Sequence, residues 1–149
     1  GEVEEVAEVP FADVLAAADA SAGEKVWRKC TACHKAAPGE NATGPYLHGV
    51  VGREIGAASG YGSYSGALSA VADVWTPENL NAFLENPKGW ASGTSMNFAG
   101  LGDIEDRANL IAWLDALDDV GRYGTVASDS RVRTAQMTKI PASPIVSKR

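Results

Sequence analysis

The feature that most constrains this 149-residue chain is the placement of its two cysteines. Both lie in the stretch KCTACHK at residues 29–35, as Cys30 and Cys33, and His34 follows the second cysteine directly. The chain has no other thiol, so any cysteine chemistry is confined to this one turn. Side chains three residues apart lie on the same side of a helical turn, which predicts that both thiols act on one group.

Four chemistries use two cysteines separated by two residues. A redox dithiol needs a thiolate at a helix start within a βαβ setting, and no strand pattern surrounds Cys30. A structural zinc site needs four ligands, and the spacing of His34 and His48 does not fit the usual pattern. A disulfide between Cys30 and Cys33 would close a very small loop and add little stability. The fourth is C-x-x-C-H, in which each thiol bonds to a haem vinyl group and the histidine ligates iron, and this pattern predicts one covalent haem c.

Three other segments of the sequence carry helical patterns, one before Cys30, one in WTPENLNAFLENP (75–87) and one in DIEDRANLIAWLDALDD (103–119). Their expected N-caps are Ser21 or Asp19, Thr76 and Asp103. Strand patterning is nearly absent, and the stretch 44–66 contains seven glycines. The sequence therefore predicts an all-α domain with long loops, and so few helices need another group, the haem, to fill the middle.

Charge divides the chain into three parts. Residues 1–20 carry six acidic side chains and no basic one, which predicts an acidic N-terminal extension or linker. Residues 121–149 carry six basic side chains against Asp129 alone, which predicts a basic, irregular C-terminal tail. The haem domain is expected at 21–120, where twelve acidic residues outnumber seven basic ones. The net charge of −6 excludes nucleic acid as a partner, because no basic stripe replaces phosphate counterions.

Three residues compete for the second axial position on the iron. Met96 lies in GTSMNFAG, a loop of small residues between the two later helical segments, where backbone can approach a flat ligand. Met137 lies in the basic tail, and His48 follows only fourteen residues after His34. A lone methionine is commonly core filler. The position of Met96 on a glycine-flanked loop favours it over the other two.

The chain resembles the class I c-type cytochromes, of the mitochondrial cytochrome c and bacterial cytochrome c2 kind. It is most similar to their alphaproteobacterial, often membrane-anchored, c552/cy branch. The matching stretches run in family order over about 95 residues, from Gly23 to Leu117. They are GEKVWRKCTACH, TGPYLHGVVGR, YSGAL, WTPENLNAFLENPKGW, GTSMNFAG and DRANLIAWL.

The resemblance implies roles for further residues around the haem. The carbonyl of Pro45 should accept a hydrogen bond from the His34 ring, which fixes the tautomer of an iron-ligating histidine. Polar hydrogens directed at the haem propionates are expected from Arg53, Tyr64 and Trp75, with Thr94 beside the methionine. His48 is implied to be structural.

The resemblance also implies how the first and last helices pack, and it shows where this chain departs from the family. Gly23 and Trp27 match the face of the first helix that crosses the last one. Leu68 stands where an asparagine is expected, and Ser95 stands where a lysine is expected. The lysine ring by which mitochondrial relatives dock is therefore largely lost.

The resemblance implies a one-electron carrier, not an enzyme, that shuttles between a bc1-type reductase and a terminal oxidase or reaction centre. We expect a periplasmic monomer, and a membrane tether upstream of Gly1 would make residues 1–20 a spacer. Two alternatives remain: a haem subunit of a dehydrogenase, and a peroxidase-like or gas-binding protein in which the methionine dissociates. The charge-transfer band between sulfur and ferric iron separates the second alternative from the carrier.

Overall fold

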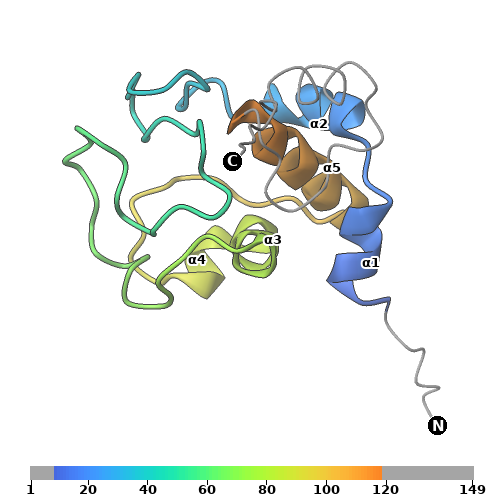
Figure 1. The fold of residues 1–149 in the computed structure, drawn as a ribbon. Coiled ribbons are helices and arrows are strands. Elements are labelled where there is room, and N and C mark those ends of the chain that lie inside the picture. The colour runs from blue at the N-terminus through green and yellow to red at the C-terminus, as the bar shows by residue number, and fades with distance from the viewer. Residues whose placement is uncertain (1–8, 119–149) are drawn as a thin grey trace, which may run out of the picture.

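The structure of the chain is a computed structural model that describes residues 9–118, and it consists of short helices joined by long loops (Figure 1). The elements are α1 (Phe11–Ala16), α2 (Ala20–Trp27), α3 (Pro77–Glu85), α4 (Pro87–Trp90), α5 (Ile104–Asp115) and the 3₁₀ turn η1 (Ala116–Asp118). The only β pairing among residues 9–118 is an isolated antiparallel bridge between Glu54 and Val74. The predicted all-α architecture, with few helices and long loops, is confirmed.

Figure 1 shows α1, α2 and α5 grouped on one side and the long loops, drawn from blue-green to green, on the other. The chain between α2 and α3 forms no helix and is held by turns and loop-to-loop hydrogen bonds. Within residues 9–118, no helix combines the length and apolar character that crossing a bilayer requires.

Helices α2, α3 and α5 begin at side-chain caps that the sequence predicts. The Asp19 carboxylate accepts a hydrogen bond from the backbone N–H of Ser21 at 2.9 Å, so Asp19 rather than Ser21 caps α2. Thr76 caps α3 by accepting from the N–H of Asn79 at 3.1 Å, and Asp103 caps α5 in the same way. Each cap satisfies a backbone donor that the first helical turn leaves without a partner.

Pro87 both ends one helix and begins the next. The sequence predicts only that it follows the end of the helix that carries Phe83. In the structure it also occupies the first position of α4, where a missing N–H costs nothing. The side chain of Asn86 caps this short helix by accepting from the N–H of Gly89 at 3.1 Å.

Residues 11–20 pack against the body of the domain, whereas the sequence assigned the whole range 1–20 to an extension. Leu15 and Ala18 are 7% and 5% exposed and belong to the hydrophobic core, and α1 contacts both α5 and α3. Composition does not reveal this packing, because Asp13 and Asp19 are exposed while Leu15 and Ala18 of the same segment are buried. Residues 1–8 and the expected tail at 121–149 lie outside the described residues.

Helices α2 and α5 cross at Gly23, as the resemblance implies. A Cβ at this position would collide with the backbone carbonyl of Asn109 and lie 2.8 Å from the Cβ of Trp113. The rings of Trp27 and Trp113 stack beside the crossing, with centroids 5.0 Å apart. Glycine is therefore required here for the close approach of two backbones.

Gly23→Ala is expected to destabilise the folded protein by about 3 kcal/mol, because the added methyl group meets backbone that cannot move without separating the helices. Chemical denaturation of the holoprotein measures this loss. Gly102→Ala is a matched control, since a Cβ there meets nothing within 4 Å. Equal destabilisation by the two substitutions would contradict the close crossing.

Candidate haem-binding site

The Cys30–His34 segment continues the chain from the end of α2 in one further helical turn. The N–H of Cys33 donates to the carbonyl of Cys30 at 3.1 Å, and the N–H of His34 donates to the same carbonyl at 2.9 Å. Both thiols are free, with Cys30 half-buried and Cys33 exposed. The turn thus presents two thiols and one imidazole from neighbouring positions.

The environment of Cys30 disfavours a thiolate. Burial is the main cause that raises the pKa of its thiol to about 11, with Cys33 adding to the rise and Lys29 opposing it. A redox dithiol works through a thiol whose pKa is lowered, which is the opposite of what is found here. A half-buried site that favours a neutral sulfur is suited to a thioether bond with a haem vinyl group, because a thioether sulfur carries no charge.

The ring of His34 is fixed by the loop that carries Pro45. Its Nδ1 lies 2.7 Å from the carbonyl oxygen of Pro45, so the Nδ1–H donates and Nε2 keeps its lone pair. Burial lowers the pKa of His34 and nearby Arg53 lowers it further, while the hydrogen bond to Pro45 partly opposes both. The imidazole is therefore held neutral, which is the form that binds a metal ion.

Two residues that the sequence analysis missed position this loop. Gly44 lies so close to the imidazole that a Cβ would collide with the Cε1 of His34, and its N–H donates to the carbonyl of Cys33 at 2.7 Å. Asn41 accepts from the N–H of Tyr46 and donates to the carbonyl of Ser59, both at 3.0 Å. An asparagine three residues before a Gly-Pro pair is a recognisable loop signal, although its hydrogen-bond partners cannot be read from the sequence.

Arg53 is half-buried, and one of its nitrogens has no partner. Its two terminal nitrogens donate to the carbonyls of Tyr46 and His48 at 3.1–3.3 Å. Its Nε is buried and makes no hydrogen bond within the described part of the chain. A buried guanidinium N–H that lacks an acceptor is costly, and a carboxylate such as a haem propionate would satisfy it.

A backbone pairing brings Trp75 next to Arg53. The N–H of Trp75 donates to the carbonyl of Arg53 at 2.9 Å, and the N–H of Gly52 donates to the carbonyl of Trp75 at 2.8 Å. Trp75 is buried and packs on Phe83 and Trp90. Two of the residues expected at the propionates therefore lie side by side.

Tyr64, the third expected propionate residue, has a different partner. Its hydroxyl oxygen accepts from the N–H of Ala58 at 3.1 Å, and its ring packs edge-on against Tyr61. The hydroxyl proton remains available to donate to another acceptor.

Met96 and Thr94 form a separate part of the site, in the loop between α4 and α5. Thr94 is buried, and its Oγ1 accepts from the N–H of Met96 at 3.3 Å. The Nζ of Lys88 lies 3.5 Å from the carbonyl of Thr94. Among residues 9–118, no hydrogen bond joins this loop to the Cys30–His34 turn. Met137 lies outside the described residues, and His48 contributes its backbone carbonyl to Arg53.

The residues present fit a haem. Two observations support this: the Nε of Arg53 lacks an acceptor among the described residues, and Gly44 lies close to the His34 ring. A third is that several loop side chains that pack on the core stay partly exposed in the polypeptide. They include Leu47, Leu68, Met96 and Phe98, together with Cys30. Apolar groups on separate loops that remain incompletely covered are expected where a large, flat apolar group completes the core.

Sequence comparison places the chain among small redox proteins. It is 45% identical over 102 residues to a cytochrome c of Euglena viridis, a match that covers 68% of this chain and 99% of the relative. It is 47% identical over 100 residues to a c-type cytochrome named cyt cy of Rhodobacter capsulatus, which covers 66% of this chain. The chain spans about half the length of that second relative, 49%.

Structural comparison also finds a cytochrome. The cytochrome c2 of Rhodospirillum centenum superposes with a TM-score of 0.60 at 35% identity, covering 67% of this chain and 98% of that one. No family model matches the chain.

Proposed function

The chain belongs to the class I c-type cytochromes, haem-based electron carriers, and we propose that it holds its one covalent haem c between His34 and Met96. Cys30 and Cys33 carry the two thioether bonds. The observation that supports this best is the 2.7 Å hydrogen bond from the His34 Nδ1–H to Pro45. The Nε2 of this neutral imidazole then keeps its lone pair, directly after a C-x-x-C turn. A permanent iron ligand needs such a lone pair in a fixed orientation.

Each residue of the site then has a physical task. The haem, when bound, supplies a one-electron couple. His34 is held in one tautomer and orientation by Pro45, and the backbone of Met96 is held by a hydrogen bond from its N–H to the Thr94 hydroxyl oxygen. Arg53 offers the Nε–H to a propionate, with Trp75 packed beside it. With both His34 and Met96 as ligands, the iron would keep no position for a substrate, and the bound haem would supply electron exchange without bond making.

We place the carrier in the periplasm, between a bc1-type reductase and a terminal oxidase or photosynthetic reaction centre. The likeness to a cytochrome cy and a cytochrome c2 supports this assignment. Spectroscopy of the holoprotein tests the ligation. We expect the sulfur-to-iron charge-transfer band in the oxidised form and no carbon monoxide binding by the reduced form. Absence of the band, together with carbon monoxide binding, would favour the peroxidase-like or gas-binding alternative.

Four exposed basic residues border the haem-bearing turn and the methionine loop, and we expect them to guide docking. They are Arg28, Lys29, Lys35 and Lys88. Lys29→Glu should slow electron transfer to an acidic acceptor roughly threefold at low ionic strength, because such charges act on the encounter rate. Stopped-flow kinetics at increasing salt should show the difference disappear.

The control for this experiment is Glu78→Lys, on the exposed first turn of α3. It should change the rate much less than Lys29→Glu. Equal, salt-insensitive rates for both variants would show that docking is apolar or uses another face.

A further inference from the structure

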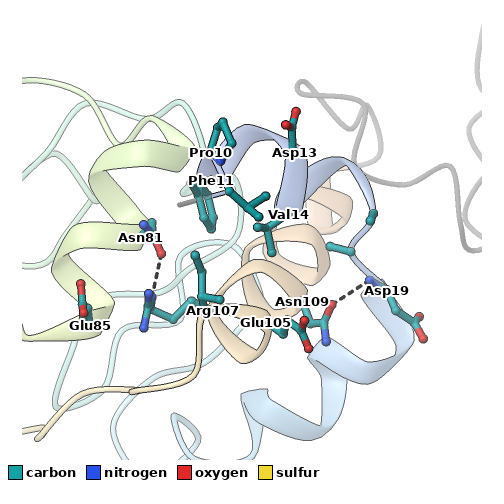
Figure 2. Close-up of a pocket in the computed structure, with 14 residues that line it drawn as sticks. Pro10, Phe11, Asp13, Val14, Asp19, Asn81, Glu85, Glu105, Arg107 and Asn109 are labelled. Carbon is teal, nitrogen blue, oxygen red and sulfur yellow. Dashed lines mark hydrogen bonds between the residues drawn. The ribbon is translucent and has the colours of Figure 1, made fainter. Parts of the chain in front are cut away.

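A cavity of about 1150 Å³ lies between α1, α3 and the first turns of α5. In Figure 2, Phe11 and Val14 face it from α1, Asn81 and Glu85 line it from α3, and Arg107 lines it from α5. Of the described residues that line it, none belongs to the candidate haem site. The groove is therefore a separate feature of the domain, formed where α1 packs onto the rest.

The inner part of the groove is apolar. Phe11, Val14 and Ile104 are each only half-buried, although they come from helices that pack together, and Ala18 lies behind them in the core. Val9, another lining residue, is 63% exposed. This surface can take up apolar side chains from a further segment of polypeptide, which would remove the remaining area from water.

The mouth of the groove is acidic. Four of its lining residues are exposed carboxylates: Asp13, Asp19, Glu85 and Glu105. The one basic lining residue, Arg107, is 4% exposed and donates to two neutral acceptors, the side chain of Asn81 and the carbonyl of Leu101, both at 2.7 Å. Four negative charges and one positive charge give the lining a net charge of −3. The groove thus favours a cationic occupant.

We propose that this groove binds residues 131–139 of the same chain, RVRTAQMTK. The segment carries Arg131, Arg133 and Lys139 and no acidic residue, so its charge of +3 complements that of the groove. Val132 and Met137 supply apolar side chains for the inner part. Residues 1–8 are the other candidate from this chain, but they include four glutamates that the acidic mouth repels.

The length of chain is sufficient for this contact. The groove is at the start of α5, and the 12 residues of that helix rise ~18 Å from the groove to its other end. Residues 119–130 lie between the helix and the proposed segment, and twelve residues span up to ~40 Å when extended. A segment tethered in this way meets the groove at an effective concentration on the order of millimolar, so weak contacts suffice.

NMR of the reduced full-length holoprotein at low salt tests the proposal. In the variant R131S/R133S/K139S, amide signals of groove residues such as Phe11, Asn81 and Glu105 should shift, and raising the salt of the wild type should move the same signals the same way. The variant R122S/K148S/R149S removes as much charge from the same tail and is the matched control. Unchanged groove signals in the first variant, or equal changes in both, would overturn the proposal.

Carbodiimide, which couples lysines to nearby carboxylates, identifies the segment that occupies the groove of the same protein. Lys139 should couple within one molecule to Glu85, Glu105, Asp13 or Asp19, and Lys148 should not. Coupling of Lys139 only to residues 1–8 would overturn the proposal. Coupling only between molecules, with groove signals that depend on protein concentration, would overturn it too, since the occupant would then be a second copy.

Discussion

Met96→Ala should leave the haem covalently attached but open one position on the iron. The thioethers are made by Cys30 and Cys33, which lie in a different part of the chain from the methionine loop. Loss of a thioether ligand removes the charge-transfer band and lowers the reduction potential, by on the order of 0.1 V or more. Absorption spectra and potentiometry measure both effects, and the reduced variant should bind carbon monoxide.

Two further variants test the competing ligands. Met137→Ala and His48→Ala should retain the charge-transfer band, since the first lies in the basic tail and the second serves Arg53 through its backbone carbonyl. If Met137→Ala abolishes the band and Met96→Ala does not, the ligand assignment is wrong. Small shifts in potential from His48→Ala are compatible with a residue near the haem.

Helices α2, α3 and α5 and the haem-bearing turn could be predicted because their signals are local. Caps at Asp19, Thr76 and Asp103 involve residues two or three positions apart, so the sequence itself contains both partners. The C-x-x-C-H turn is equally local. The contact between His34 and Pro45 spans 11 residues and was expected from the family resemblance, not from the spacing of the residues.

The parts that could not be predicted depend on contacts between distant segments. Asn41 hydrogen-bonds a carbonyl 18 residues away, and nothing in its neighbourhood identifies Ser59 as the partner. The first helix has only six residues, and its place in the core depends on surfaces of α3 and α5. The groove exists only because those three elements meet, so no pattern within one of them could reveal it.

Replacing Cys30 and Cys33 together with alanine should abolish covalent haem attachment and leave the polypeptide largely unfolded. Between Trp27 and Pro77 the chain forms no helix, and its loops are joined by scattered hydrogen bonds. Ordering each of these residues costs roughly 1–2 kcal/mol of conformational entropy, which the polypeptide's own buried loop residues do little to offset. Far-UV circular dichroism should show most of the helical signal lost, and a denaturant titration should show no cooperative transition.

The control for the cysteine variant lies in the same turn. Thr31 is exposed between the two cysteines, and its hydroxyl donates to the carbonyl of Arg28 at 3.0 Å. Thr31→Ala should therefore cost under about 1 kcal/mol and keep the haem. Cys33→Ala retains the half-buried thiol of Cys30 for a single thioether, so its stability should lie between those of Thr31→Ala and the double variant. A helical haem-free chain that unfolds cooperatively would show instead that the packing of α1, α2 and α3 on α5 suffices to form the fold without the haem.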